Sequence, residues 1–371
     1  MPSLFSPRYG VFLLADFEKL MIEAFKQAEK GLGYTRPNPA VGAIIFKDGR
    51  IIARGYHRRA GMPHAEIEAL GKAGEESKDG VLITTLEPCC HSSKKTPPCA
   101  EAIISAGIKT VVGAINDKNP KVNGRGYRKL RAAGINVVTG VLKDKATEFY
   151  EPYFKFITTG MPFVTLKFAQ STDGRIATTS GHSHWISSPQ SLKLSHQLRA
   201  VNDSILIGRK TLAADDPELT TRLVSGSNPV RIILSESGKI PRNGTMFTDK
   251  AAPIYLATAS NNKPNLKNID RVIRVKKIKQ GLDLNHLLSK LGKLDITTVL
   301  VEGGSGVLTS FLSQKLADKL IICIAPIITG NGISAIGDLG VKEIGDSIAI
   351  KQVRWFDLGP DMVITGKPVW K

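Results

Sequence analysis

The residues between 64 and 99 contain the side chains with the clearest potential for chemistry. His64 is followed two residues later by Glu66, and Cys89 and Cys99 come later in the same stretch. One imidazole and two thiolates can bind a zinc ion and leave its fourth tetrahedral position open to water, which is typical of a catalytic zinc site. A carboxylate beside such a site can carry protons to and from that water. We therefore predict that His64, Cys89 and Cys99 bind one Zn²⁺ and that Glu66 is the catalytic proton carrier.

Two alternatives to this ligand set remain open. Cys90 competes with Cys89 as a ligand, because it lies nine residues before Cys99 and is equally able to supply a thiolate. We favour Cys89, since it directly follows a proline, as in the H-x-E…P-C…C signature of zinc deaminases. Cys90 or His91 could also be a fourth ligand, which would make the site structural. The position of Glu66 favours catalysis instead.

The elements expected around these residues place two of the ligands at helix ends. A helix over 65–73 begins directly after His64, and a helix over 99–106 begins at Cys99. Both ends offer unpaired N–H groups and the positive end of the helix dipole, which stabilise thiolates. Further helices are expected at 16–31, 126–133 and 143–156, and strands at 41–46, 51–56, 81–86, 109–115 and 136–139. This alternation predicts an α/β domain with a helix-covered sheet.

The second half begins after a break at 158–162, where we place the domain boundary. Core strands are expected at 163–169, 204–207, 230–234, 254–257 and 299–301, and strands at 320–325 and 362–365 are expected to complete the sheet. Residues 302–306, Glu-Gly-Gly-Ser-Gly, follow a core strand and open a helix. Such a turn before a helix N-terminus can bind phosphate. The lysine-rich segment 263–279 is expected to be a solvated face.

The composition fits a two-domain enzyme that acts on phosphorylated ligands. The chain has 371 residues, a net charge of +18, scattered basic residues and only 6% aromatic residues. This pattern favours phosphorylated small molecules over nucleic acid as the main partner. Three of the four cysteines cluster between 89 and 99, which indicates metal binding in a reducing compartment. No apolar segment approaches the ~18 residues needed to span a bilayer, so we expect a cytoplasmic protein with no membrane partner.

The motifs of both halves resemble one family. Four motifs resemble the N-terminal half of the bifunctional deaminase/reductase family of riboflavin biosynthesis: His64-Ala65-Glu66, Thr85-Leu86-Glu87-Pro88-Cys89, Thr96-Pro97-Pro98-Cys99-Ala100 and Arg36-Pro37-Asn38-Pro39-Ala40-Val41-Gly42. Four further motifs resemble the C-terminal half of that family: Ser171-Thr172-Asp173-Gly174-Arg175, Ser183-His184-Trp185-Ile186, Asp215-Asp216-Pro217-Glu218-Leu219-Thr220 and Val301-Glu302-Gly303-Gly304. The resemblance covers about residues 16–370.

The resemblance implies a fold and an activity for each half. It implies a cytidine-deaminase-like three-layer α/β/α domain over 16–150, followed by a dihydrofolate-reductase-like α/β domain over 160–371. The first would remove ammonia from a diaminopyrimidinone ribosylamino 5′-phosphate with the help of Zn²⁺. The second would reduce the ribosyl group of the product to ribityl with NADPH.

The resemblance also assigns residues that contact ligands. In the first half, Asn38 matches a substrate-binding position. The substrate-binding positions of the second half are Ser183, Arg199, Leu219, Arg222 and Glu302. Its cofactor-binding positions are Ala169, Trp185, Thr211, Asp215, Glu236, Gly304, Ser305, Gly306, Val307, Leu308, Thr309 and Ser310. Arginine suits a substrate phosphate, because its forked guanidinium matches phosphate oxygens.

The chain departs from the family pattern between Cys89 and Cys99, where the interval of ten residues is one longer than expected. This loop supports an alternative in which one half is active and its partner domain is degenerate. A nucleic-acid base deaminase with an accessory domain is a second alternative, motivated by the charge of +18 and opposed by the low aromatic content. We expect a homo-oligomer, either a dimer or a tetramer. A basic residue beside the adenosine 2′-phosphate would decide between NADPH and NADH, and the sequence does not place one.

Overall fold

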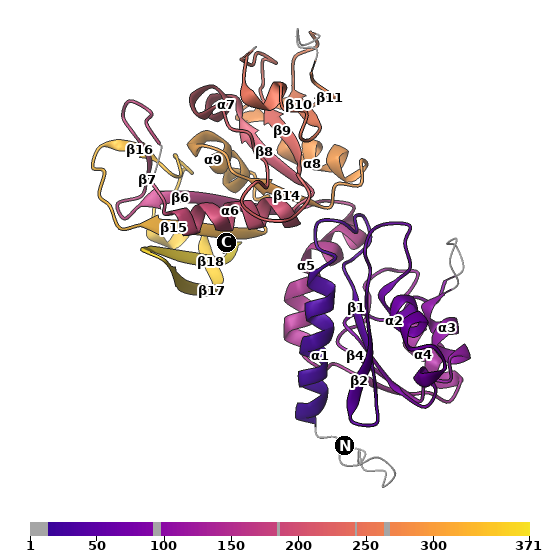
Figure 1. The fold of residues 1–371 in the computed structure, drawn as a ribbon. Coiled ribbons are helices and arrows are strands. Elements are labelled where there is room, and N and C mark those ends of the chain that lie inside the picture. The colour runs from indigo at the N-terminus through magenta and orange to yellow at the C-terminus, as the bar shows by residue number, and fades with distance from the viewer. Residues whose placement is uncertain (1–13, 92–97, 184–185, 242, 263–267) are drawn as a thin grey trace. The chain divides into compact units, whose positions relative to one another are not determined.

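The structure is a computed structural model that describes residues 14–91, 98–183, 186–241, 243–262 and 268–371. The chain divides into two compact units, Met1–Thr159 and Gly160–Lys371 (Figure 1). Each unit has its own sheet and its own buried apolar residues. The chain therefore has separate hydrophobic cores in its two halves, as its length and apolar content predict.

The described part of the first unit is built on a five-stranded sheet in the order β2-β1-β3-β4-β5. The strands are β1 (Gly42–Lys47), β2 (Arg50–Tyr56), β3 (Val81–Thr84), β4 (Thr110–Gly113) and β5 (Asn136–Thr139). β1 pairs antiparallel with β2 and β3, whereas β3, β4 and β5 are parallel. All residues of β3 and β4 are buried, as is typical of central parallel strands that are covered on both faces.

Helices cover both faces of this sheet. In Figure 1, α1 (Leu14–Glu29) and α5 (Lys143–Thr159) lie on one side, and α2 (Ala65–Ala73), α3 (Cys99–Ser105) and α4 (Arg125–Ala132) lie on the other. This is the three-layer α/β/α arrangement that the resemblance implied. Gly55 of β2 allows α2 to approach closely, because a Cβ atom at Gly55 would lie 2.2 Å from the carbonyl oxygen of Ala65. The first turn of α2, which carries Glu66, is thereby packed against the sheet.

Helix α5 extends three residues beyond its expected end at residue 156. The hydroxyl groups of Thr158 and Thr159 donate hydrogen bonds to the carbonyl oxygens of Phe154 and Lys155, each at 2.7 Å. These bonds give the two hydroxyl groups partners on the preceding turn of the helix, so that neither has to compete with the helical backbone for a hydrogen bond. The predicted break at 158–162 is therefore wrong for the two threonines, which continue the helix.

The described part of the second unit is built on a nine-stranded sheet in the order β11-β10-β9-β8-β14-β6-β15-β18-β17. The strands are β6 (Phe163–Ser171), β8 (Ser204–Gly208), β9 (Val230–Leu234), β10 (Ile254–Thr258), β11 (Arg271–Arg274), β14 (Thr298–Val301), β15 (Lys319–Ala325), β17 (Ala349–Leu358) and β18 (Asp361–Val369). In this order, the strands from β11 to β15 are parallel to one another. β18 pairs antiparallel with β15, and β17 pairs antiparallel with β18 at the edge of the sheet. The main helices are α6 (Pro189–Val201), α7 (Arg209–Asp215), α8 (Leu284–Gly292) and α9 (Ser305–Ser313).

Residues of the central strands pack alternately on opposite faces of this sheet. Leu206 of β8 belongs to the apolar cluster that includes Leu287 of α8 and Leu308 of α9. Its neighbour Ile207 belongs to a different cluster, together with Leu212 of α7. Helices thus pack on both faces of a mostly parallel sheet, which agrees with the expected dihydrofolate-reductase-like α/β domain.

Two expectations about the second unit were wrong. The strand at 362–365 does not complete the sheet, because β17 pairs outside it with both of its faces exposed. The segment 263–279 is not simply a solvated face, because β11 lies within it and buries Ile273; residues 263–267 fall outside the described residues. Both strands mix charged and apolar residues without strict alternation, so they lack the pattern that predicts a strand.

Two short antiparallel pairs complete the second unit. β7 (Arg175–Thr178) pairs with β16 (Gly332–Ser334), and β12 (Lys277–Ile278) pairs with β13 (Gly281–Leu282). Within the described ranges, every helix is too short or too polar to cross a membrane.

Candidate active sites

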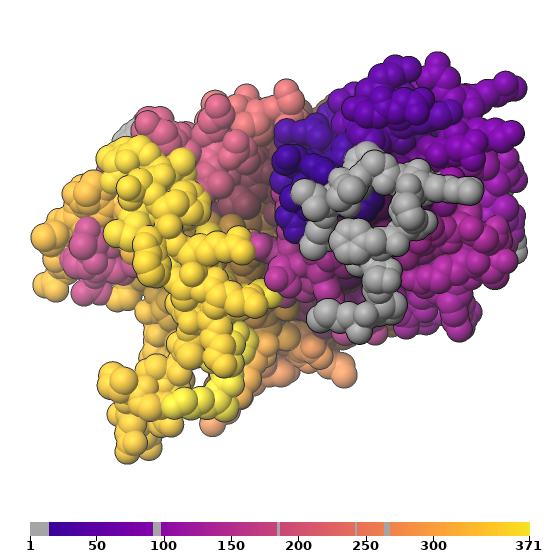
Figure 2. Space-filling model, turned by 90° about the horizontal axis from the view of Figure 1, so that it is seen from below, coloured from indigo at the N-terminus to yellow at the C-terminus, as the bar shows by residue number. Residues whose placement is uncertain are grey.

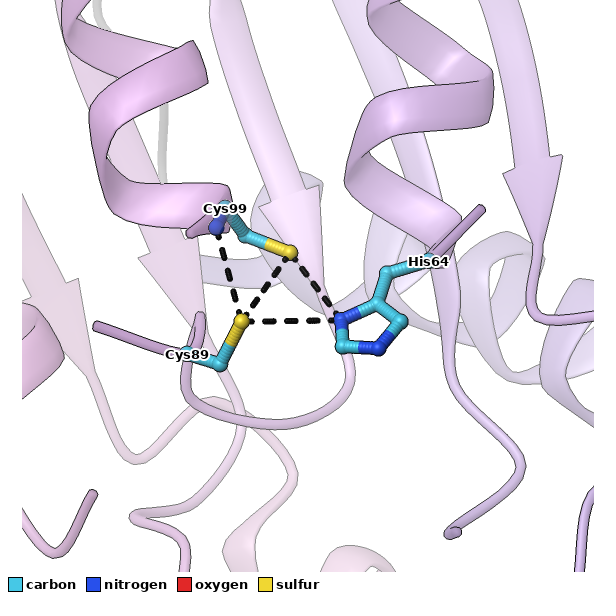
Figure 3. Close-up of side chains that lie close together, drawn as sticks. All are labelled: His64, Cys89 and Cys99. Atoms are coloured by element: carbon cyan, nitrogen blue, oxygen red, sulfur yellow. Dashed lines mark hydrogen bonds between the residues drawn. The ribbon is translucent and has the colours of Figure 1, made fainter. Parts of the chain in front are cut away.

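Three predicted zinc ligands lie together at the edge of the first sheet. His64 precedes the first residue of α2, Cys99 is the first residue of α3, and Cys89 lies in the loop after β3 (Figure 3). His64 Nδ1 lies 3.2 Å from Cys99 Sγ and 3.5 Å from Cys89 Sγ, and the two sulfur atoms are 3.5 Å apart. The backbone N–H of Cys99 donates to Cys89 Sγ at 3.4 Å, as expected for a thiolate beside a helix N-terminus.

This triangle has the size that a zinc ion requires. Zinc bonds of about 2.0–2.3 Å in a tetrahedron give ligand-to-ligand distances of roughly 3.5–3.8 Å. The observed distances of 3.2 to 3.5 Å therefore need only a small expansion to hold one ion. Cys90 is not part of this group, and its sulfur instead lies 3.9 Å from the carbonyl oxygen of Lys121. The arrangement favours Cys89 over Cys90 as the ligand.

The two cysteines have opposite tendencies to ionise before a metal binds. A hydrogen bond from Cys99 lowers the pKa of Cys89 below the usual thiol value. The same hydrogen bond, together with burial, raises the pKa of Cys99 well above it. The pair therefore shares one proton, which must leave when both sulfur atoms bind a cation.

Glu66 lies in the first turn of α2, next to the ligand group, and is 3% exposed. Burial raises the pKa of Glu66 to about 7, while the nearby His64 acts in the opposite direction. A carboxyl group with this pKa can both accept and donate a proton at neutral pH, which suits a proton carrier.

His57 is a residue of this site that sequence reasoning missed. It is 2% exposed, and its ring lies 5.2 Å from that of His64, measured between centroids. His57 Nδ1 lies 3.1 Å from the carbonyl oxygen of Pro63, and Nε2 lies 3.4 Å from Asn38 Nδ2. Donation from Nδ1 to Pro63 leaves Nε2 as an acceptor for the Asn38 amide, which orients that predicted substrate-binding side chain. A single histidine with no metal-ligand spacing carries no signal of this role.

Glu87 holds the loop beside Cys89 in place. Its carboxylate is 3% exposed and accepts hydrogen bonds from the backbone N–H groups of Asp117, Gly124, Gly126 and Tyr127, at 2.8–3.4 Å. These contacts join the chain just before Cys89 to the N-terminus of α4, where a negative charge is favourable. The sequence motif contained Glu87 but gave it no function.

We predict that Cys89 and Cys90 respond differently to the same substitution. Cys89→Ser should lower the zinc content of the purified protein from about one ion per chain to well below it, because a serine hydroxyl is a poor zinc ligand. Cys90→Ser should keep the zinc, because this sulfur faces Lys121. Elemental analysis of both variants measures the difference, and zinc loss in Cys90→Ser alone would reverse the assignment.

The second unit contains a cavity of about 670 Å³ at the C-terminal ends of β6, β14, β8 and β9. Its size is typical of small-molecule and cofactor sites, and ligands of open α/β sheets bind at this edge. The cavity brings together these residues predicted to contact substrate or cofactor: Ala169, Ser183, Thr211, Asp215, Glu236, Glu302, Gly304, Ser305, Gly306, Val307 and Ser310.

The N-terminus of α9 faces this cavity. The helix spans nine residues, and no side chain caps its first turn. Gly304 donates its N–H to Thr211 Oγ1 at 3.1 Å, which ties the turn to α7. A Cβ atom at Gly306 would meet no other atom within 4 Å, so the turn is open to a ligand. An open helix N-terminus in a cavity fits the phosphates of a dinucleotide.

Arg199 and Glu302 form a buried ion pair beside the cavity. Arg199 Nε and Nη2 donate to the two carboxylate oxygens of Glu302 at 3.1 and 2.6 Å, and the side chains are 9% and 12% exposed. Burial raises the pKa of Glu302, but the charge and hydrogen bonds of Arg199 outweigh it and leave this pKa below its usual value. The carboxylate that lines the cavity is therefore ionised at neutral pH.

Two buried arginines hold the loop around Leu219. Arg199 donates to the carbonyl oxygen of Thr220, and Arg231 donates to that of Glu218, both at 3.3 Å. Between them, Leu219 has a φ of 57°, which is uncommon for a residue with a side chain. Arg231 is fully buried and pairs with Asp249 at 2.7 Å. We expected only a core strand at Arg231, because an arginine in an apolar run gives no sign of what it contacts.

The remaining predicted residues lie elsewhere. Arg222 is 49% exposed and contacts Glu218 at 3.3 Å, so its head group remains accessible. Leu308 is fully buried in the core, and neither it nor Thr309 lines the cavity, because only residues three or four positions apart share one face of a helix. Trp185 lies outside the described residues. Lys167, which the sequence did not single out, is a buried lysine that lines the cavity.

Comparison with known proteins supports the same division of the chain. The family model described as "Cytidine and deoxycytidylate deaminase zinc-binding region" matches residues 15–115, and that described as "RibD C-terminal domain" matches residues 162–364. The riboflavin biosynthesis protein RibD of Aquifex aeolicus is 44% identical over 92% of this chain and 95% of its own length. The chain belongs to the RibD family. RibD of Escherichia coli is 36% identical over 94% of this chain and 98% of its own length.

Solved structures of RibD proteins have the same fold. A diaminohydroxyphosphoribosylaminopyrimidine deaminase/5-amino-6-(5-phosphoribosylamino)uracil reductase from Thermotoga maritima is 36% identical. It superimposes with a TM-score of 0.85 over 96% of this chain and 99% of its own. Acinetobacter baumannii RibD is 32% identical, with a TM-score of 0.84 over 96% of this chain and 100% of its own. As a RibD family member, the chain is a bifunctional enzyme of riboflavin biosynthesis with a zinc-binding deaminase domain followed by a reductase domain.

Proposed function

We propose that the deaminase domain, residues 16–150, acts on a diaminopyrimidinone ribosylamino 5′-phosphate. The reductase domain, residues 160–371, then reduces the ribosyl group of the product to ribityl with NADPH. The observation that carries the proposal is that His64, Cys89 and Cys99 form a group of the size that a metal ion requires, with the buried Glu66 next to it. The unit that follows in the chain has a cavity of the size that a dinucleotide requires. The relative from Thermotoga maritima carries both activities in its name.

In the first unit, the residues support hydrolytic removal of an amine. When bound, zinc lowers the pKa of water to roughly 7 and so supplies a nucleophile at neutral pH. Glu66 would move two protons in turn: the first from the attacking water to the ring nitrogen, where it stays, and the second from the resulting hydroxyl group to the amino group, which leaves as ammonia. Its pKa of about 7 suits both transfers. We assign a contact with the pyrimidine to Asn38, and the hydrogen bond between its amide and His57 supports this assignment.

In the second unit, the residues support the binding of a cofactor and a sugar phosphate. When bound, NADPH supplies a hydride to C1 of the sugar in its open form. The open N-terminus of α9 receives the cofactor phosphates. Ser183 donates to Asp215 at 3.0 Å at the cavity wall, and Glu302 accepts hydrogen bonds from sugar hydroxyl groups. Arg222, with its exposed guanidinium, binds the substrate phosphate.

The proposal can be tested one activity at a time with the purified protein. The pyrimidine substrate alone should release ammonia, and removal of zinc by a chelator should abolish that release. The deaminated product should oxidise NADPH whether or not zinc is present. Either activity missing from a folded, zinc-loaded protein would support the alternative of one degenerate domain. Residues 90–95 form the altered loop that motivates that alternative, and residues 92–95 of it lie outside the described residues.

We expect a homo-oligomer, a dimer or tetramer, and the exposed edge of the second sheet offers a surface through which two chains could associate. β17 leaves one edge of the second sheet unpaired in the described residues, and both of its faces are exposed. Figure 2 shows the C-terminal part of the chain, in yellow, at the surface. Trp355 is 72% exposed there. An exposed apolar edge strand is a template for pairing with another strand. Light scattering should give two or four times the chain mass, and Trp355→Lys should lower it; a monomeric wild type would contradict this.

The chemistry of the ligands also agrees with a cytoplasmic location. Cys89, Cys90 and Cys99 are free thiols, and two of them must stay reduced to bind zinc. Fractionation of the source cells checks this location, and recovery with an oxidising compartment would contradict it.

A further inference from the structure

The order of strands sets the direction in which a dinucleotide lies in the cavity. Substrate-binding residues such as Glu302 follow β14, next to β6, and the open helix end that suits phosphates also follows β14. On the other side, beyond β8, Ser235 and Glu236 follow β9 and line the far end of the cavity. Three strand spacings, roughly 14 Å, separate β6 from β9. If the nicotinamide lies beside the substrate-binding residues, on the β6 side of the cavity, the adenosine lies toward β9.

Glu236 lies where the adenosine ribose would be. It stands two residues beyond the end of β9, and its carbonyl oxygen accepts hydrogen bonds from Ala259 N–H and Thr258 Oγ1 at 3.1 and 3.0 Å. Its backbone is thus fixed by the neighbouring strand. In dinucleotide-binding sheets, an acidic residue at such a position accepts the ribose 2′-hydroxyl of NADH and repels the 2′-phosphate of NADPH. Taken alone, Glu236 would favour NADH.

Lys277 changes the charge at this position. Its Nζ lies 2.6 Å from Glu236 Oε1, and both side chains are well exposed, so the pair can open toward a ligand. Lys277 belongs to β12, which pairs with β13, and the β13 residues Gly281 and Leu282 line the cavity. The hairpin that carries Lys277 is therefore part of the adenosine end of the cavity. It also carries Lys276 and Lys279, which make it strongly basic.

We infer that Lys277, held by Glu236, recognises the adenosine 2′-phosphate and so gives the enzyme its preference for NADPH over NADH. This inference rests on the proposed reductase function. Lys277 is a specificity-determining residue that binds the phosphate when the cofactor enters, and Glu236 limits the strength of that contact by competing for the lysine. The basic residues 276–279 belong to the segment that the sequence predicts to be a solvated face, and this inference makes them part of the cofactor site.

Other cations at the cavity serve a different part of the cofactor. Arg209 and Lys210 are the first residues of α7, which follows β8. In the sheet, β8 lies between β9 and β14, and the phosphate-binding turn follows β14. Near the pyrophosphate, which NADPH and NADH share, they cannot distinguish the two cofactors. This difference provides a matched comparison, since loss of Lys210 should weaken both cofactors and loss of Lys277 only one.

The test measures binding by titration calorimetry, with NADPH, NADH, 2′,5′-ADP and 5′-AMP as ligands. Lys277→Ala should raise the Kd for NADPH and 2′,5′-ADP about tenfold and leave NADH and 5′-AMP within about twofold, because a charge-assisted contact to the 2′-phosphate is lost. Glu236→Gln should lower the Kd for NADPH about threefold, because the competing carboxylate is removed. Lys293→Ala, with the same charge change at the far end of α8, should alter none of them.

Two outcomes separate the inference from the function on which it rests. A wild type that binds NADPH and NADH equally, or a Lys277→Ala variant that weakens both or neither, would overturn the role of Lys277 and leave the reductase function standing. A wild type that binds neither dinucleotide would overturn the reductase function itself.

Discussion

Glu66→Gln should reduce ammonia release by roughly 10²- to 10⁴-fold, the usual contribution of a positioned proton carrier. Glutamine keeps the shape of the side chain but cannot accept a proton from water or donate one to the leaving group. Since Glu66 is not part of the His64, Cys89 and Cys99 group, the variant should retain about one zinc ion per chain. Ammonia release at saturating substrate, with zinc measured on the same sample, gives the result.

Glu68→Gln is the matched control for this prediction. Glu68 lies on the same helix and also becomes a neutral amide, but it contacts Arg58 and Lys72, each at 2.8 Å, and the N–H of Tyr56 in β2, and it is not part of the ligand group. Its deaminase activity should stay close to that of the wild type. Both variants should oxidise NADPH normally when given the deaminated product. If folded Glu66→Gln lost both activities, the assignment of one reaction to each unit would be refuted.

Arg199→Met should destabilise the second unit by about 3–5 kcal/mol and abolish reduction. Removing one partner of a buried pair leaves the other charge without compensation, and the carboxylate of Glu302 is only 12% exposed. The loop around Leu219 also loses a donor to Thr220. Denaturant unfolding of the variant and the wild type measures the change. Arg222→Met, on the 49% exposed arginine, should weaken substrate binding while changing stability by less than about 0.5 kcal/mol.

The pH dependence of this effect has a defined sign. In the wild type, the pKa of Glu302 lies below its usual 4.5, so its charge contributes stability that is present at neutral pH and lost in acid. Without Arg199, burial is opposed only by the smaller effects of Lys167 and His196, so we expect this pKa to rise and the ionised group to cost stability at neutral pH. The destabilisation by Arg199→Met should therefore be largest near pH 7 and shrink as the pH falls below about 5. An equal loss at all pH values would mean that lost packing, not unpaired charge, dominates.

The candidate zinc ligands could be predicted because residue type and spacing alone indicate their chemistry. Cysteine and histidine are rare in this chain, so His64, Cys89 and Cys99 stand out as candidate ligands, and the proline before Cys89 favours this cysteine over Cys90. The structure then decides what spacing leaves open, since Cys90 faces Lys121 and not the other ligands.

Residues that act through long-range contacts could not be predicted in the same way. Arg231 reads as one charged residue in an apolar strand, and only the fold brings it to Glu218 and Asp249. His57 has no spacing signal, and its role depends on the turn that brings Pro63 to its ring. Lys277 lies in a basic segment that resembles any solvated surface until β12 and β13 place it beside Glu236.

Fold prediction failed where a strand lacks a buried face. The central strands of both sheets are buried runs of apolar residues and could be recognised. β17 exposes both faces and contains Gln352 with a φ of 52°, which interrupts its alternation. Nothing in its local sequence distinguishes it from a loop, and pairing with β18 alone makes it a strand.

The most direct test of the account is the ratio of the two products in a single coupled assay. The zinc-loaded chain is given the diaminopyrimidinone ribosylamino phosphate with excess NADPH, and ammonia and NADP⁺ are both measured to completion. We expect one NADP⁺ for each ammonia, with no NADP⁺ formed before ammonia appears. Ammonia without NADP⁺, or NADP⁺ formed while Glu66→Gln releases no ammonia from the same substrate, would contradict two reactions carried out in sequence by one chain.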